Sequence, residues 1–94
     1  MRVRWTRLAL ADVAAACDYL ATEDPPARRA LLVRVKAAVK KLRRYPRLGR
    51  VVPERSAQGY RELILSPYRL VYEVAAGEVR LLRLWHSRRE LTGL

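Results

Sequence analysis

The spacing of apolar residues follows a helical period in the first half of the chain and a strand period in the second half. Between residues 7 and 21, apolar residues recur every three or four positions and form one stripe of a helix: Leu10, Val13, Cys17 and Leu20. Asp24 and Pro25 predict the start of a second helix, because Asp is a good capping residue and Pro is tolerated at the first helical position. The apolar stripe of this second helix consists of Leu31, Val35, Ala38, Val39 and Leu42.

Alternating apolar and polar residues predict a short edge strand at residues 1–5 and, after the helices, strands over 60–65 and 68–74. A last strand is predicted over 79–86, where Leu81, Leu82 and Leu84 make both sides apolar, so this strand is expected to be central and covered. One face of the 68–74 strand carries Tyr68, Leu70, Tyr72 and Val74. A chain of 94 residues suits a single domain, residues 1–94. The predicted fold is α+β: an N-terminal helical hairpin, preceded by a short edge strand, packed on a small antiparallel sheet.

Positive charge is concentrated in one segment of the chain. The formal net charge is +11, and 17 of the 20 basic residues are Arg. Residues 28–50 contain ten basic residues and no acidic one. The helical period places five of them opposite the apolar stripe of the second helix: Arg29, Lys36, Lys40, Arg43 and Arg44. This face is predicted to bind a target, either nucleic acid or an acidic protein segment.

Several classes of function lack the residues that they require. One Cys and one His cannot form a structural zinc site, and no glycine-rich phosphate loop is present, so no metal or other cofactor is expected. A single Cys cannot form an intrachain disulfide, which fits a reducing compartment. The longest nearly apolar stretch, residues 8–17, is too short to span a membrane, so we expect a cytoplasmic protein without membrane contact.

A second group of candidate residues lies along the predicted strands and just beyond the last one. His86 is the only histidine, so it is the only side chain whose ordinary pKa suits proton transfer near neutrality. With Arg69 and Arg61 as phosphate ligands, His86 could act as the base in metal-independent RNA cleavage. Glu54 or Glu62 could be a second acid–base group, or each could instead pair with an arginine. Other cations near the end of the last strand are Arg83, Arg88 and Arg89.

The element order and several short motifs together resemble the RelE/ParE superfamily of bacterial toxins from type II toxin–antitoxin modules. The motifs are ALAD at 9–12, LRRYPRLGR at 42–50, YREL at 60–63, YRLVY at 68–72 and LRLWHSRREL at 82–91. The resemblance implies a small α+β toxin that inhibits growth and takes part in functions such as plasmid stabilisation. It also implies a cognate antitoxin that wraps the toxin in a hetero-oligomer and covers its working surface.

Two activities occur in this superfamily: the ParE-like branch inhibits DNA gyrase, whereas the RelE-like branch cleaves mRNA on the ribosome. Arg69 is similar to the strand arginine of the ribonuclease branch, His86 to its C-terminal histidine and Glu54 to its acidic residue. However, Ser87 stands where several ribonucleases have an aromatic hydroxyl, and residues 86–91 resemble the ParE-like ending. The favoured hypothesis is a gyrase inhibitor, in which His86, Arg83, Arg88 and Arg89 contribute to target binding.

Two alternatives remain open from the sequence. One is a ribosome-dependent mRNA endoribonuclease, an mRNA interferase, with His86, Arg69 and Arg61 as its catalytic residues. The other is a nucleic-acid-binding module without toxicity. In the gyrase hypothesis the chain breaks no bond itself, so the sequence alone does not decide whether it is an enzyme.

Overall fold

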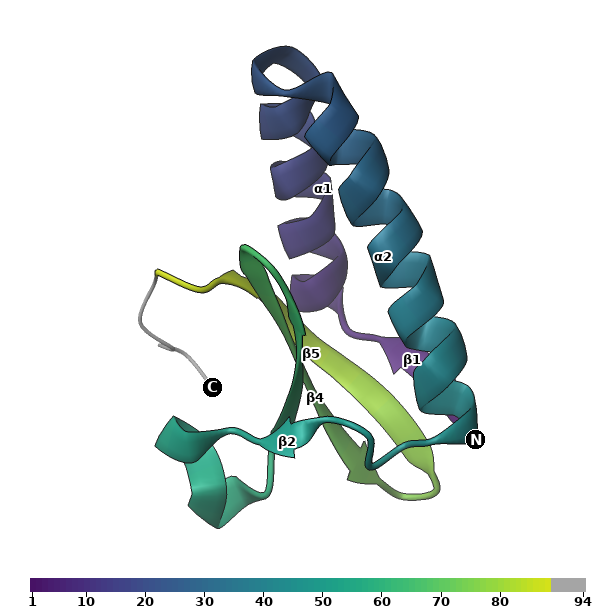
Figure 1. Ribbon diagram of the computed structural model, residues 1–94. Coiled ribbons are helices and arrows are strands. Elements are labelled where there is room, and N and C mark those ends of the chain that lie inside the picture. Colours follow the sequence, from purple (N-terminus) through teal and green to yellow (C-terminus); the bar gives the residue numbers. More distant parts are fainter. Residues whose placement is uncertain (89–94) are drawn as a thin grey trace.

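A computed structural model describes residues 1–88 as two antiparallel helices against one five-stranded sheet (Figure 1). The elements are β1 (Arg2–Trp5), α1 (Arg7–Glu23), α2 (Pro25–Arg44), β2 (Arg50–Val51), a 3-10 helix (Pro53–Gln58), β3 (Arg61–Leu65), β4 (Tyr68–Ala75) and β5 (Glu78–His86). The predicted α+β class, with a helical hairpin on a small sheet, is confirmed. Neither α1 nor α2 is apolar enough over a sufficient length to cross a membrane.

Both helices begin at capping residues, and Asp24 is the cap that the sequence predicts. The Thr6 hydroxyl accepts a hydrogen bond from the Ala9 backbone N–H, at 3.2 Å, and donates to the Leu81 carbonyl at 2.7 Å. The Asp24 carboxylate accepts from the Ala27 N–H at 3.1 Å. Asp24 is the only residue between the two helices, so the hairpin reverses direction within one capping position.

The apolar stripe of α2 is confirmed, and that of α1 is confirmed at Val13, Cys17 and Leu20 but not at its first position. Leu31, Val35, Ala38 and Leu42 are buried, and Val39 is partly buried. On α1, however, Leu10 is 54% exposed, and Ala9 takes its place in the core. The bond from the Thr6 hydroxyl to the Leu81 carbonyl holds the start of α1 against β5, and Ala9 rather than Leu10 faces the core there.

The sheet has the strand order β1-β5-β4-β3-β2 and is mixed rather than wholly antiparallel. β1 pairs with β5 in parallel, because the helical hairpin connects it to the rest of the sheet as a crossover. The other strand pairs are antiparallel. The tight turn between β4 and β5 has positive φ at both Ala76 and Gly77, as a two-residue hairpin with a type I′ turn requires.

One extra residue in β5 breaks the regular alternation of its side chains. Tyr72 pairs with Leu81, but its neighbour Val71 pairs with Arg83, so Leu82 forms a β-bulge. As a result, Leu81 and Leu84 both belong to the core beneath the helices, although they are three positions apart. The bulge also decides which face of the sheet each later residue of β5 occupies.

The two faces of the sheet are covered differently. The helices cover one face, and the main core lies between the helices and this face. It includes the predicted set Tyr68, Leu70, Tyr72 and Val74. On the other face, a smaller cluster joins Val71 and Trp85 to Val52, with Tyr60 and Leu82 against it. The segment around the 3-10 helix therefore covers part of this second face.

Candidate functional site

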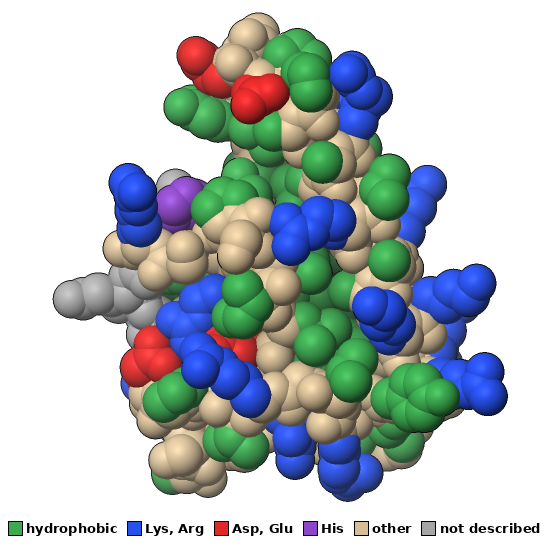
Figure 2. Space-filling view, in the orientation of Figure 1, with side chains coloured by type: hydrophobic (Ala, Val, Ile, Leu, Met, Phe, Trp, Pro, Cys, Tyr) green, Lys and Arg blue, Asp and Glu red, His purple; other side chains and the backbone are tan. Residues whose placement is uncertain are grey.

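A groove follows the junction between the helical hairpin and the sheet. It consists of three adjoining hollows of about 560, 300 and 270 Å³. The first two share Leu20, Pro67 and Tyr68, and the second and third share Arg34 and Leu65. Figure 2 shows hydrophobic side chains along this junction with Lys and Arg beside them. We call these three hollows together the interlayer groove.

His86 lies in the largest hollow of the interlayer groove, on the face of the sheet that the helices cover. Its ring meets the ring of Tyr68 edge to face, with 5.6 Å between the centroids. The Arg88 backbone N–H donates a hydrogen bond to His86 Nδ1 at 3.3 Å. Because Nδ1 is an acceptor in this contact, the proton of a neutral ring is on Nε2. Tyr19 and Asp12 of α1 line the same hollow.

Asp12 fixes α1 to the bulged part of β5. Its carboxylate accepts hydrogen bonds from Arg83 Nε at 2.7 Å, from Arg83 Nη2 at 3.0 Å and from the Leu84 N–H at 3.0 Å. The Arg83 guanidinium also lies over the Trp85 ring, 4.2 Å from its centroid. The hydrogen bond with Asp12 raises the pKa of Arg83, an effect that burial opposes. Arg83, predicted to bind the target, is therefore engaged within the protein.

Arg69 lies on the opposite face of the sheet and is held by two carboxylates. It forms a bidentate pair with Glu54, with N–O distances of 2.9 and 3.1 Å, and its Nε donates to Glu62. Glu62 is 1% exposed and also accepts from Arg50 Nε at 2.6 Å. Glu54 and Glu62 are both paired with arginines in this structure, which is one of the two arrangements expected from the sequence.

The shared charges shift the pKa values of the Glu54–Arg69 pair in opposite directions. The hydrogen bond from Arg69 lowers the pKa of Glu54 from 4.5 to about 2. In turn, the hydrogen bond to Glu54 raises the pKa of Arg69 above its usual range. A guanidinium committed to two carboxylates has little positive charge left for a phosphate.

Arg61 lies near the other end of β3, away from His86. Its Nη1 donates to the backbone carbonyls of Gly49 and Arg47, at 2.8 and 3.4 Å. The Gly49 N–H donates to the Tyr72 hydroxyl at 2.8 Å, and a Cβ on Gly49 would lie 2.6 Å from the Glu62 carbonyl oxygen. Arg61 thus holds the connector close against the sheet.

The three predicted catalytic residues are not brought together. Tyr68 pairs with His86 across the strands, and Arg69 pairs with Trp85. Since successive residues of a strand point to opposite faces, His86 faces the helices, and Arg69 faces away from them. Between residues 1 and 88, no three His, Cys, Asp or Glu side chains gather as a metal site would require.

The cations of α2 are arranged as the helical period predicts, and they form no ion pair with any residue between 1 and 88. The five predicted binding residues of this helix are all exposed: Arg29, Lys36, Lys40, Arg43 and Arg44. In the part of the chain that the structure describes, none of them lies within 4.0 Å of a carboxylate oxygen. Arg88 is also exposed, whereas Arg89 lies outside the described residues.

Two features of the site were missed from the sequence. Tyr19 and Tyr68 line the interlayer groove, but as isolated aromatic residues they resemble core positions. Asp12 is a single acid in an alanine-rich helix, and its partner Arg83 lies 71 residues further along the chain. A carboxylate close to the apolar stripe of α1 was the one available signal for that contact.

Comparison with known proteins agrees with this architecture. Residues 3–91 match the family described as ParE toxin of type II toxin–antitoxin system, parDE. Toxin RelE2 of Caulobacter vibrioides is 37% identical over 89 residues, which cover 94% of this chain and 97% of that protein. A solved structure of the chromosomal ParDE TA system from P. aeruginosa has a TM-score of 0.69 and 28% identity, covering 92% of this chain and 95% of that one. The chain therefore belongs to the ParE toxin family of type II toxin–antitoxin systems.

Proposed function

We propose that this chain is the toxic component of a type II toxin–antitoxin pair and that it arrests growth by inhibiting DNA gyrase. The match to the ParE toxin family over residues 3–91 is the observation that carries this proposal. A cognate antitoxin binds the toxin and suppresses it, as the similarity to a ParDE structure suggests.

The positions of His86 and Arg69 support gyrase inhibition over RNA cleavage. A ribonuclease needs its base and its phosphate ligand on the same side of the reacting phosphate. Here the two side chains are on opposite faces of the sheet, and Arg69 is neutralised by Glu54 and Glu62. To bind a phosphate, Arg69 would have to leave both carboxylates. The buried charge of Glu62 would then keep only Arg50 as its partner, which costs free energy.

Expression and gyrase assays test the choice of target. Induction of the chain alone should arrest growth and produce filamentous cells, and the purified protein should inhibit DNA supercoiling by gyrase. Cleavage of mRNA at codon-defined positions on ribosomes, abolished by His86→Ala, would instead establish the ribonuclease alternative. Unimpaired growth at confirmed expression would contradict both toxic activities and leave a nucleic-acid-binding module.

The interlayer groove is the proposed binding site of the antitoxin. Its second and third hollows are lined by apolar side chains, and Leu48 and Ile64 remain about half exposed there. Arg34 and Lys41 of α2 line the third hollow. An amphipathic segment with acidic residues on one edge would cover the apolar surface and neutralise these two cations.

Association kinetics with the product of the neighbouring gene test this site. We expect the on-rate to fall as salt increases, because screening shortens the reach of the toxin's charge. Arg34→Glu with Lys41→Glu should slow association and speed dissociation, whereas reversal of the distant, exposed Arg2 and Arg7 should change the on-rate alone. An on-rate that does not depend on salt would contradict electrostatic attraction, and unchanged dissociation of the Arg34/Lys41 variant would place the antitoxin elsewhere.

A further inference from the structure

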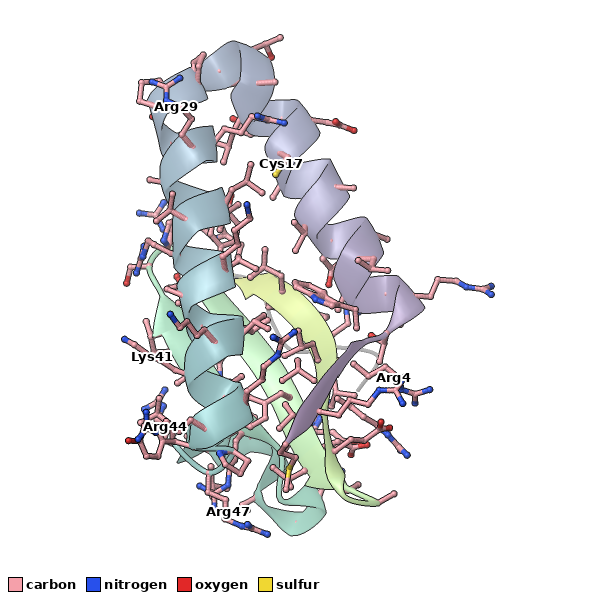
Figure 3. All side chains as sticks on the ribbon, turned by 90° about the vertical axis from the view of Figure 1, so that its right-hand side faces the viewer. Arg4, Cys17, Arg29, Lys41, Arg44 and Arg47 are labelled. Atoms are coloured by element: carbon pink, nitrogen blue, oxygen red, sulfur yellow. The ribbon has the colours of Figure 1, made fainter. Side chains whose placement is uncertain are left out.

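A separate hollow lies on the other flank of α2, where this helix crosses β1. It has a volume of about 270 Å³, and six side chains line it: Trp5, Val35, Lys36, Val39, Lys40 and Arg43. In Figure 3, α2 lies in front of the sheet with β1 to its right, and the labelled Lys41 and Arg44 project from the side of α2 away from β1. The hollow beside β1 is therefore distinct from the interlayer groove, which Lys41 lines.

The cations of this hollow form one row. Lys36, Lys40 and Arg43 are spaced by four and three residues, so they lie above one another along the helix, with rises of about 6 and 4.5 Å. All three are exposed, and among residues 1–88 no carboxylate oxygen is within ion-pair distance of any of them. Three neighbouring like charges repel one another, and a bound polyanion would relieve this repulsion.

Trp5 supplies a different kind of contact. It is the last residue of β1, and it is partly buried against the main core while it lines the hollow beside the three cations. An indole next to a row of cations matches the chemistry of an unpaired nucleotide strand, in which charged phosphates alternate with flat bases. An acidic peptide would satisfy the cations but would have no planar group for the indole.

We propose that this hollow binds a single-stranded nucleic acid, with phosphates at Lys36, Lys40 and Arg43 and one base stacked on Trp5. A single strand fits better than a duplex, because the faces of paired bases are already stacked on each other. Such a site would let the toxin hold a single strand of nucleic acid that is exposed at its target. It does not depend on which target the toxin has, since neither gyrase nor the ribosome is needed for binding.

Binding of a fluorescein-labelled, mixed-sequence 15-nucleotide DNA strand to the full-length chain tests the cationic row. Fluorescence anisotropy should show affinity that falls with salt, with a log–log slope of about −2 for three phosphate contacts. Lys36→Gln with Lys40→Gln should weaken binding about tenfold or more and reduce the slope by about 1.4. The matched control is Arg34→Gln with Lys41→Gln, which removes the same charge from the opposite flank of α2.

The control variant distinguishes binding at this hollow from binding that depends only on the net charge of the protein. We expect the Arg34/Lys41 variant to bind the strand within about threefold of the unmodified chain. Equal losses in the two variants would overturn the proposal, because they would show that only total charge matters. Tighter binding of a duplex or of poly-glutamate than of the single strand would overturn it as well.

Substitutions of Trp5 test the stacked base. Trp5→Leu should weaken binding about tenfold, and Trp5→Phe should restore much of the affinity, because a phenyl ring also stacks on bases. Circular dichroism and thermal unfolding confirm that each variant is folded. If Trp5→Phe is folded but binds no better than Trp5→Leu, or if folded Trp5→Leu binds as tightly as the unmodified chain, no base stacks at Trp5 and the proposal fails.

Discussion

The arginines of the sheet and the cations of α2 carry the same charge in very different surroundings. Among residues 1–88, five of the seven arginines in the strands have a carboxylate oxygen within 3.5 Å: Arg4, Arg50, Arg69, Arg80 and Arg83. These pairs use Asp12, Glu54, Glu62, Glu73 and Glu78. The exposed cations of α2 form no ion pair within the described chain.

This difference separates charges that maintain the fold from charges that are free to bind. A paired and partly buried guanidinium stabilises the protein, and its removal leaves an uncompensated carboxylate. An unpaired cation on a helix surface contributes little to stability and repels its neighbours. Variants should therefore divide into two groups: losses at the sheet should reduce stability, and losses on α2 should reduce binding.

The largest expected effect follows from removal of Arg69. Arg69→Leu leaves Glu62, which is 1% exposed, with Arg50 as its remaining partner. We expect the free energy of unfolding to fall by about 3 kcal/mol. Urea titration followed by circular dichroism measures this change. Lys40→Leu is the control on α2 and should alter stability by less than about 0.5 kcal/mol; similar losses in both variants would contradict the division.

Removal of Asp12 should have an intermediate effect. Asp12→Ala removes the two bonds from Arg83 and the bond from the Leu84 N–H, so unfolding free energy should fall by about 2 kcal/mol. Asp18→Ala, on the exposed side of the same helix, should leave stability nearly unchanged. Equal melting temperatures of the two variants would show that the α1–β5 contact does not stabilise the fold.

Local signals in the sequence predicted the parts of the fold that depend on neighbouring residues. Asp24 accepts a hydrogen bond from a backbone N–H three residues away, and Pro25 follows it in the first turn of α2. The apolar stripe of α2 can be predicted from the helical period alone. Each of these features is decided by contacts across a few positions, so the pattern of residue types is enough to find it.

Features that depend on distant contacts were not predictable in the same way. Ala9 rather than Leu10 is buried at the start of α1, where Thr6 bonds to β5, and the bulge at Leu82 becomes visible only once the register of β4 and β5 is known. That register places His86 and Arg69 on opposite faces of the sheet, although the sequence suggests both as residues of one catalytic site. The candidate residues could be identified from the sequence, but their grouping required the tertiary structure.

Acid should weaken the sheet network in a defined pH range. The folded-state pKa of Glu54 is about 2, below its ordinary value of 4.5, so the pair with Arg69 stabilises the protein above pH 4.5 and is lost as the pH falls toward 2. Because the Glu54 side chain is 48% exposed, solvent screening limits this contribution to about 1 kcal/mol. Unfolding of the unmodified chain and Glu54→Gln should therefore differ at pH 6 and converge near pH 2. A constant difference over this range would contradict the assignment.

The smallest expected effect is an increase in stability. It distinguishes most clearly a residue that contributes to binding from one that stabilises the fold. Lys40 is four residues from both Lys36 and Arg44, and like charges at this spacing destabilise a helix. Lys40→Gln should raise the unfolding free energy by about 0.4 kcal/mol at low salt, and 1 M salt should remove the gain by screening. Thermal unfolding at both salt concentrations measures this difference. A gain that persists at 1 M salt would point to helix propensity rather than repulsion. If the same variant is more stable yet binds a nucleic-acid strand less tightly, the positive charge at Lys40 serves binding at the expense of the fold.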